Sequence, residues 1–330
     1  MRNILVTGGA GMIGSNLVKR LVEMGDNVIV VDNLWRGNLT NLNNKSGFPV
    51  IDLETNFINI DLSITGVLDD LLDSVDYVVH LADIVAGIGY VFDNQANIFR
   101  QNILINSNTI ASVRKSNVKG FLYIGTACSF PETLQNKLDY KLLVENDLYP
   151  AEPESAYGWS KLMGQYETNL LSQETKIKTC TLMLHNVYGS PCDYSVERSQ
   201  VIPSLIRKVI DVKEKDLVVW GSGKQGRAFL HVNDVVEGII AALDKGWGKG
   251  HIQLGPNICT SIKDIADILV DISPESIDIV YDRTKPEGDL ARAANFSKAK
   301  RELGWEPKVD LKNGLLDLYN WIDKEINEKI

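Results

Sequence analysis

The stretch Thr7-Gly8-Gly9-Ala10-Gly11-Met12-Ile13-Gly14 decides the fold, because it lies between two apolar patterns of different period. Ile4–Thr7 has the composition of a buried strand, and Ile13–Met24 has apolar residues at helical spacing, ending before Gly25. The glycines allow a tight turn and let phosphate groups approach the amides at a helix N-terminus. A glycine triplet also occurs in ordinary tight turns, so the residues around it must decide between the two interpretations.

Downstream residues favour a dinucleotide site. Asn27–Val31 is a second apolar run, and Asp32 follows it. A carboxylate at this point can accept hydrogen bonds from the hydroxyls of an adenosine ribose. It would repel a 2′-phosphate and therefore favours NAD over NADP, although the guanidinium of Arg36 could tolerate such a phosphate. The alternative for Asp32 is a cap or turn residue.

Short apolar runs alternate with helical patterns through the first half of the chain. Further strands are expected at Phe57–Ile60, Tyr77–Ala82, Phe121–Gly125 and Thr179–His185. Helices are expected at Ile98–Lys115 and Tyr157–Ser172. Strands alternating with helices predict an α/β fold, with a doubly wound, parallel Rossmann sheet.

After residue 186 the regular alternation of strand and helix patterns ends. Three helices are expected at Val201–Val212, Asn233–Leu243 and Ser261–Val270, and a strand at Leu217–Trp220. Asn233 is predicted to cap the second helix, and Ser261 with Asp264 to form a capping box on the third. We expect an NAD-binding domain over residues 1–185 and a smaller α/β substrate-binding lobe over 186–330, interleaved with the first.

Composition narrows the class of protein. The chain has 330 residues, a net charge of −9, 44% hydrophobic and 23% charged residues, which are globular proportions. The acidic balance argues against a nucleic-acid partner, and the sequence lacks the apolar run of about 18 residues that a membrane span needs. Its four cysteines are too few for a disulfide scaffold and lack metal-ligand spacing, so no metal is expected. A reducing, cytoplasmic location is the simplest expectation, since glycines interrupt the N-terminus before a signal peptide could develop.

Tyr157-Gly158-Trp159-Ser160-Lys161 is the strongest chemical signal. Tyr157 and Lys161 are four residues apart and share one face of a helix. A neighbouring ammonium stabilises a phenolate, which could then exchange a proton with a substrate hydroxyl while hydride moves to or from NAD. The pattern also occurs on solvated helix faces, but after a dinucleotide fingerprint the catalytic interpretation is favoured.

The motifs and their spacing resemble the extended short-chain dehydrogenase/reductase superfamily along nearly the whole chain. In that family, His-Leu-Ala-Ala ends the fourth strand, and here His80-Leu81-Ala82-Asp83 matches except at Asp83. For His80 a packed histidine is favoured over a catalytic one. The resemblance implies that Asp61 and Leu62 contact adenine and that Asn102 lies near the nicotinamide. The expected cofactor contacts are Gly8, Gly11, Met12, Ile13, Gly14, Asp32, Asn33, Arg36, Asp61, Leu62, Leu81, Ala82, Asn102, Tyr157, Lys161 and Val187.

The end of the fifth strand indicates the type of reaction. The family places a hydroxyl there to bind the reacting group, and Thr126 fits. The 4,6-dehydratases have acidic residues next, but this chain has Ala127 and Cys128, so elimination is disfavoured. A Cys in this place, with an aromatic residue and Pro after it, resembles GDP-mannose 3,5-epimerases and GDP-fucose synthases, in which it is one of two acid/base groups. The alternative for Cys128 is a small buried hydrophobe.

The same resemblance implies a substrate site. The segment from Asp83 to Gly89 is similar to the family's substrate loop, and the motifs around Asn186, Arg227 and Arg292 are similar to those that bind substrate, the two arginines as a diphosphate clamp. The expected substrate contacts are Gly87, Ile88, Asn186, Gln200, Val201, Arg227 and Arg292. The families' second acid, a His or Lys, falls on Gln200 or Val201, and neither can donate a proton in the same way.

We therefore predict an NAD-dependent nucleotide-sugar epimerase that oxidises C4 transiently, with Thr126, Cys128, Tyr157 and Lys161 as catalytic residues. A GDP-sugar is favoured over a UDP-sugar. One alternative is a C4 dehydrogenase or ketoreductase that exchanges its cofactor with solution, and another is a non-catalytic NAD sensor. The family commonly forms homodimers through the helices at Ile98–Lys115 and Tyr157–Ser172, whose apolar stripes would equally suit packing within one chain.

Overall fold

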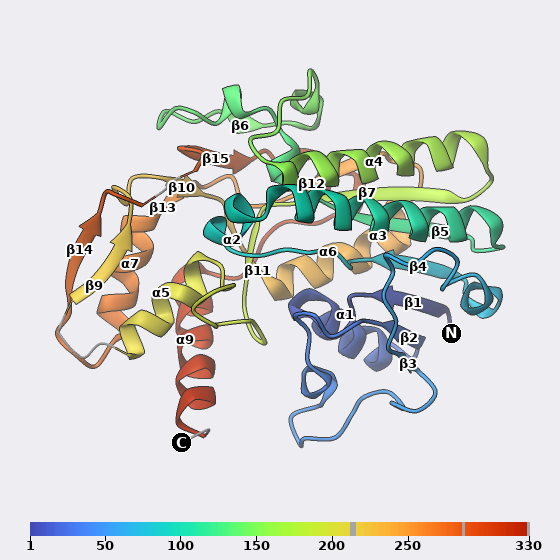
Figure 1. Cartoon of the computed structure of the whole chain (residues 1–330), viewed down its shortest axis with the longest axis horizontal. Helices are drawn as coiled ribbons and strands as arrows, with labels where there is room; N and C mark the ends of the chain where they lie inside the picture. Colours follow the sequence, from blue (N-terminus) through green and yellow to red (C-terminus); the bar gives the residue numbers. More distant parts are fainter. Residues whose placement is uncertain (212–215, 286–287, 329–330) are drawn as a thin grey trace.

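The computed structural model describes residues 1–211, 216–285 and 288–328, and its centre is a parallel sheet of seven strands. The strand order is β12-β7-β5-β4-β1-β2-β3 (Figure 1). These strands are β1 (Asn3–Thr7), β2 (Asn27–Val31), β3 (Phe57–Ile58), β4 (Tyr77–His80), β5 (Gly120–Thr126), β7 (Lys178–Leu184) and β12 (His251–Leu254). Because β1 pairs with both β2 and β4, the strand order reverses there and leaves a crevice at the carboxyl ends. The predicted Rossmann fold is confirmed.

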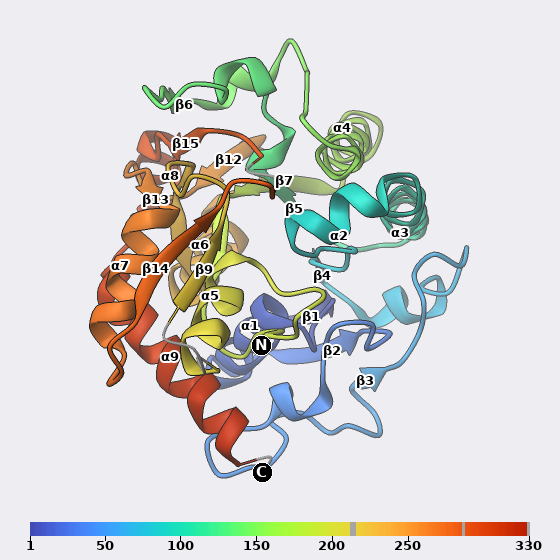
Figure 2. The same ribbon diagram turned by 60° about the vertical axis from the view of Figure 1, so that its left-hand side comes forward.

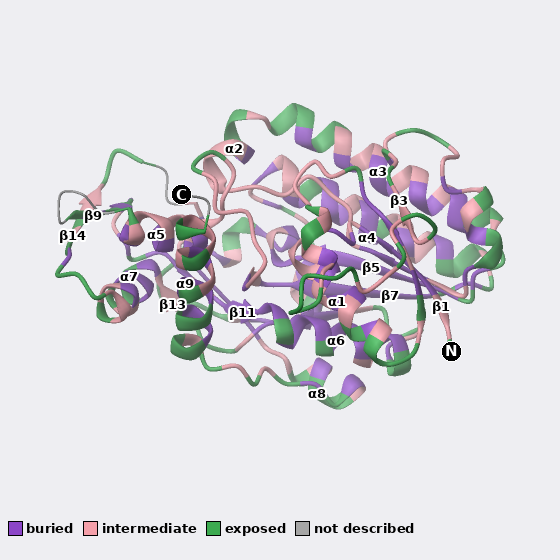
Figure 3. Ribbon diagram, turned by 90° about the horizontal axis from the view of Figure 1, so that it is seen from below, coloured by how far each residue is buried: buried purple, intermediate pink, exposed green. Residues whose placement is uncertain are grey.

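Helices cover both faces of this sheet, as Figures 1 and 2 show. α1 (Met12–Glu23) and α6 (Val232–Lys245) pack on one face, where Leu17 and Ile239 share a core with the sheet. α3 (Gln95–Lys115) and α4 (Ala156–Glu174) cover the other face, where Ile105 contacts the core around Phe121. Burial on both faces explains why the strands are almost continuously apolar, and the sheet is buried along its length in Figure 3.

A second lobe lies beyond the carboxyl ends of the central strands (Figure 1). α5 (Val201–Ile210) and α7 (Ile262–Ile272) pack against β9 (Asp216–Trp220), which pairs in parallel with β14 (Asp278–Asp282). α9 (Leu311–Asn327) packs against both of these helices. Their apolar faces form a separate core that includes Ile206, Leu217, Ile265 and Leu318. This lobe therefore has its own core and closes the crevice from the open end of the sheet.

The two lobes exchange strands. β12 comes from the second half of the chain, yet it pairs with β7 at the edge of the central sheet, and sequence reasoning did not predict it. Conversely, β6 (Leu142–Leu143) joins a small sheet of order β13-β10-β15-β6 with strands from the second half. Its other strands are β13 (Thr260–Ser261), β10 (Gly226–Arg227) and β15 (Ala291–Ala294). A separate parallel pair consists of β8 (Asn186–Tyr188) and β11 (Phe229–His231). α2 (Ile88–Asp93) and α8 (Ser297–Leu303) are two further α-helices.

The helix caps agree with the sequence in one case and differ in another. Ser261 and Asp264 form the predicted capping box at the start of α7. The prediction of Asn233 as a cap is wrong, because α6 begins at Val232 and the ring of His231 accepts the Asn233 amide at 3.2 Å. The expected helix end at residue 212, and residues 286 and 287 of the late loop, lie outside the described residues. No helix in the described part of the chain has the length and apolarity to cross a membrane.

Candidate active site

A cleft of about 1970 Å³ lies between the carboxyl edge of the sheet and the second lobe. Every residue predicted above to contact cofactor or substrate lines this cleft, with the exception of Asn102. The four predicted catalytic residues, Thr126, Cys128, Tyr157 and Lys161, are also in its wall. The topology therefore brings together residues that are far apart in the sequence.

The turn after β1 is so closely packed that Gly8 and Gly14 have no space for a side chain. Gly8 has a φ of 68°, and a Cβ on it would lie 2.9 Å from the Ala82 nitrogen. A Cβ on Gly14 would lie 2.2 Å from the Gly8 carbonyl oxygen, so α1 can approach the turn only without a side chain there. α1 has no side-chain cap and no acidic residue in its first turn. Its N-terminal amides thus face the cleft without a competing acceptor, which fits a bound diphosphate.

Asp32 is held at the end of β2 by the same turn. Its carboxylate accepts hydrogen bonds from the Ala10 amide at 3.0 Å and the Leu34 amide at 2.8 Å. Burial raises the pKa of Asp32, and these two bonds oppose that rise. A fixed carboxylate in this place fits the hydroxyls of an adenosine ribose.

Arg36 also lines the cleft, and its partners come from distant parts of the chain. Its guanidinium donates to the Val85 carbonyl at 2.7 Å, and its Nε lies 3.6 Å from the Asp193 carboxylate. Asp193 also lies 3.5 Å from Arg198, whose guanidinium donates to the Trp35 carbonyl at 3.1 Å. Burial raises the pKa of Asp193, but hydrogen bonds and the two guanidinium groups bring it below its ordinary value. We call Arg36, Asp193 and Arg198 the clasp, because they connect the loop after β2 to the segment before α5.

The start of α4 places Tyr157 beside the end of β5. Ser155 caps the helix by accepting the Gly158 amide at 3.3 Å, and a Cβ on Gly158 would lie 2.2 Å from the Cys128 carbonyl oxygen. The two segments therefore touch, and the Thr126 hydroxyl accepts the Cys128 amide at 3.2 Å. Burial raises the pKa of Tyr157 well above its ordinary value, and Cys128 and Asp83 add to that effect. A hydrogen bond with Thr126 acts in the opposite direction.

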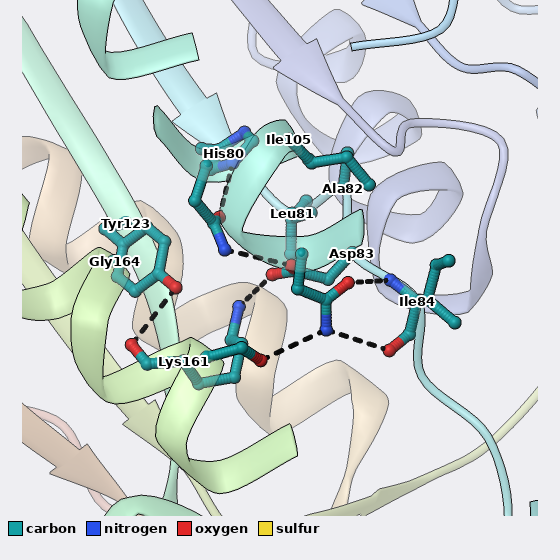
Figure 4. A network of polar contacts seen from close by, with 12 residues as sticks. His80, Leu81, Ala82, Asp83, Ile84, Ile105, Tyr123, Lys161 and Gly164 are labelled. Atoms are coloured by element: carbon teal, nitrogen blue, oxygen red, sulfur yellow. Dashed lines mark hydrogen bonds and ion pairs between the residues drawn. The ribbon is translucent and has the colours of Figure 1, made fainter. Parts of the chain in front are cut away.

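Lys161 is paired with Asp83, a contact that sequence reasoning missed. The two side chains are 4% and 1% exposed, and the ammonium donates to the carboxylate (Figure 4). The Lys161 Nζ also lies 4.6 Å from the centre of the Tyr123 ring. The signal was present in the sequence, because Asp83 is the one residue that departs from the family's His-Leu-Ala-Ala.

His80 and Asn102 support this region from behind. His80 is fully buried between Thr7 and Asn106, does not line the cleft, and has its pKa lowered to about 3, mainly by burial, which agrees with a packed histidine. Asn102 differs from the expectation of a cofactor contact, because it is fully buried and outside the cleft wall. Its side chain instead accepts the Ile84 amide at 2.8 Å and donates to the Ile84 carbonyl at 3.2 Å. It reaches the cleft only by holding that loop.

The far end of the cleft carries the two arginines predicted to bind a diphosphate. Arg292 is only 3% exposed and bonds to Gln135 at 3.0 Å, Asp289 at 3.2 Å and Asn186 at 3.3 Å. Despite burial, the pKa of Arg292 is raised, first by Cys128 and then by Asp289. Arg227 donates to the Asp289 carbonyl at 2.6 Å. Arg292 is thus part of the wall beside Cys128.

Glu154 lies among these charges, and sequence reasoning assigned it no role. Burial and the neighbouring Asp289 carboxylate together raise the pKa of Glu154 to about 7, against the opposing effect of Arg227 and Arg292. Gln200 and Val201 line the cleft at the start of α5, as the N-cap and first residue of that helix. Among the described residues, no group of three His, Cys, Asp or Glu side chains is placed to hold a metal ion.

Comparison with known proteins identifies the family. Residues 4–255 match the model of the NAD dependent epimerase/dehydratase family, which is well over half of the chain. The chain belongs to this family. It is accordingly an enzyme of the nucleotide-sugar class that uses NAD, and the glycine turn, the uncapped α1 and Asp32 provide a fitting site for that cofactor.

Individual relatives refine the comparison. The chain is 29% identical to GDP-mannose 3,5-epimerase 1 of Oryza sativa subsp. indica, over 99% of this chain and 83% of that relative. It is 27% identical to the probable GDP-L-fucose synthase 1 of Oryza sativa subsp. japonica, over 96% of this chain and 91% of the other. Among solved structures, the UDP-glucose 4-epimerase of Thermotoga maritima with UDP-glucose has a TM-score of 0.86 at 27% identity, covering 98% of this chain and 99% of that one.

Proposed function

We propose that this protein is an NAD-dependent epimerase of a GDP-sugar that works by transient oxidation at C4. The observation that carries the proposal is the meeting of Tyr157, Thr126 and Cys128 in one wall of the cleft, where the start of α4 touches the end of β5. The preference for GDP rests on two relatives whose names are those of GDP-sugar enzymes. The UDP-glucose in the Thermotoga maritima structure makes UDP-sugars the alternative to test.

In this proposal, Tyr157 accepts the proton of the C4 hydroxyl, and Thr126 holds that hydroxyl by a hydrogen bond. Bound NAD would accept the hydride from C4 and return it later in the same turnover. Because burial and the nearby Cys128 and Asp83 raise the pKa of Tyr157, the phenol needs a positive charge beside it to lose its proton. The nicotinamide ring would supply that charge when the cofactor is oxidised.

Cys128 is proposed as the group that removes a proton from the carbon next to the C4 ketone. The C–H bond breaks, its electron pair passes into the enolate, and the thiolate takes the proton. The neighbouring Arg292 guanidinium, which is held by Gln135, Asp289 and Asn186, orients the sulfur. Gln200 and Val201 cannot act as the second acid, so inversion requires that water in the cleft give a proton to the enolate face opposite Cys128. We expect such inversion at one centre rather than at C3 and C5 together.

The clasp favours an epimerase over a dehydrogenase that exchanges NAD with solution. Asp193 lies within 3.6 Å of both Arg36 and Arg198 and so joins two loops that border the cofactor end of the cleft. A cofactor under such a clasp would dissociate slowly, as an internal hydride cycle requires. A pure NAD sensor has no need for Tyr157 and Thr126 beside a thiol.

The test is incubation of the enzyme with GDP- and UDP-sugars in D2O, followed by NMR and mass spectrometry of the products, together with release of bound cofactor by heat. We expect NAD to co-purify, one sugar to be epimerised, and solvent deuterium to enter at C3 or C5. Label at neither carbon, with inversion at C4, would remove Cys128 from the mechanism. A net change in the NAD/NADH ratio would favour the dehydrogenase, and turnover by Tyr157→Phe at the wild-type rate would refute the proton transfer.

We also propose that the protein is a homodimer of the reducing cytoplasm, with α3 and α4 at the interface. Phe99 on α3 and Tyr166 on α4 are 39% and 52% exposed, although both are large and apolar. Light scattering should give the mass of a dimer, and Phe99→Glu should give a monomer. A monomeric wild-type protein would contradict this proposal.

A further inference from the structure

A continuous chain of hydrogen bonds runs behind the cleft from Thr7, next to the glycine turn, to Lys161. Figure 4 shows its part from His80 to Lys161. The Thr7 hydroxyl accepts the amides of Leu81 at 3.1 Å and Ala82 at 3.2 Å, and its oxygen lies 2.7 Å from His80 Nδ1. His80 Nε2 is 2.9 Å from the Asn106 side-chain oxygen, and the Asn106 nitrogen donates to the Asp83 carboxylate at 3.1 Å. The chain ends where Lys161 donates to the second Asp83 oxygen.

From Thr7 to Asp83 every donor in this chain points in the same direction, and Lys161 donates to Asp83 from the other end. An ionised Asp83 can only accept, so Asn106 must present its nitrogen to Asp83 and its oxygen to His80. His80 must then carry its proton on Nε2, which leaves Nδ1 to accept from Thr7. His80 stays neutral, because burial lowers its pKa to about 3. The backbone amides that start the chain and the ammonium that ends it thus hold the Asp83 carboxylate in one orientation.

The consequence concerns charge at the catalytic end of the cleft. A lone Lys161 would place a positive charge beside Tyr157 and beside any oxidised nicotinamide. Lys161 and Asp83 together form a pair without net charge, whether the shared proton lies on the Lys161 nitrogen or on the Asp83 oxygen. Both side chains are almost fully buried, so water does little to screen them.

We propose that Asp83 is a positioning residue that neutralises Lys161 and thereby makes the enzyme favour oxidised over reduced nicotinamide. An oxidised ring is a cation and a reduced ring is neutral, so only the oxidised ring is repelled by an unpaired ammonium. The pairing also leaves the nicotinamide as the charge that activates Tyr157, which couples proton release to the oxidised state of the cofactor. This inference rests on the proposed NAD site and on Tyr157 as the proton acceptor.

The first experiment compares the dissociation constants of NAD⁺ and NADH for the wild type, Asp83→Ala and Asp83→Glu by fluorescence titration at one pH. We expect Asp83→Ala to shift the preference toward NADH by about fivefold or more, and Asp83→Glu to restore most of the wild-type ratio. Asp26→Ala is the control, because Asp26 forms an ion pair with Arg2 that is more exposed and lies outside the cleft. It should leave the ratio unchanged.

The second readout is the pH profile of kcat/KM. Since Asp83 raises the pKa of Tyr157, Asp83→Ala should move the acidic limb of the profile to lower pH. If Asp83→Ala does not fold, the isosteric Asp83→Asn replaces it in both measurements. A folded variant whose NAD⁺/NADH ratio stays within twofold of the wild type would overturn the proposal. A wild type that binds neither form of the cofactor would refute the NAD site itself.

Discussion

The carboxyl group of Glu154 offers a test of the electrostatics of the cleft through stability. Burial, with the neighbouring Asp289, raises its pKa from 4.5 to about 7. Because the pKa is higher in the folded state, the folded state binds more protons than the unfolded state between these two pKa values. The free energy of unfolding therefore falls as the pH rises through this range. Glu154 therefore stabilises the fold least above pH 7, and the wild type should lose stability as the pH rises from about 4.5 to 7. Glu154→Gln stays neutral and removes this contribution.

The size of the effect follows from the two pKa values. The difference between 4.5 and about 7 corresponds to at most about 3 kcal/mol. Glu154 is half-buried, so screening by solvent reduces the expected value to about 1–2 kcal/mol. Urea unfolding at pH 5, 6, 7 and 8 would measure it as the change in the free-energy difference between wild type and Glu154→Gln. As the pH rises, the free energy of unfolding of Glu154→Gln should increase relative to that of the wild type.

Glu152→Gln is the control, because Glu152 is two residues away, carries the same charge and is exposed. Its free energy of unfolding should follow the wild type at all four pH values. If Glu154→Gln also runs parallel to the wild type between pH 5 and 8, the carboxyl is not desolvated in the cleft, and the reasoning from burial and Asp289 is refuted.

Three further substitutions have expected outcomes. Tyr157→Phe should lower single-turnover hydride transfer by about 10²- to 10⁴-fold while NAD binding, measured by calorimetry, stays within twofold. Cys128→Ser should abolish deuterium incorporation at C3 or C5 in D2O, whereas Cys259→Ser, with a thiol outside the cleft wall, should not. Asp193→Asn should raise the NAD dissociation rate in stopped-flow by about three- to tenfold, because it opens the clasp, and an unchanged rate would leave the clasp without a role.

The central sheet could be predicted because its signals are local. Apolar runs, the glycine turn and helical spacing each lie within a few residues and agree with one another, and the observed strands end within two residues of their expected ends. β12 escaped prediction because only Ile252 and Leu254 are apolar in its four residues, with His251 before them and Gln253 between them. Its place depends on pairing with β7, about 70 residues earlier. Two-residue strands such as β6 carry even less periodic signal.

The site residues also differ in whether a local sequence signal could predict them. Thr126 and Asp32 were predictable because the first ends a parallel strand and the second directly follows one, and the carboxyl ends of such strands meet at one edge. The partners of the charged groups could not be predicted, because they are distant in the sequence. Asp83 and Lys161 are 78 residues apart, and Arg292 and Gln135 are 157 residues apart. Motifs therefore identify which side chains enter the cleft, whereas tertiary contacts decide which charges remain free to act there.

Asp83 shows how such a contact can still leave a trace in the sequence. Asp83 stands where the family motif His-Leu-Ala-Ala has its last Ala, so it breaks a local pattern. A carboxylate beside buried strands is destabilising unless it is paired. Such a residue survives in a folded protein only with a cation or several donors around it, and here Lys161 and Asn106 provide both. Because Lys161 already belonged to the catalytic motif, the departure at position 83 located a change in the electrostatics of the active site rather than a neutral substitution.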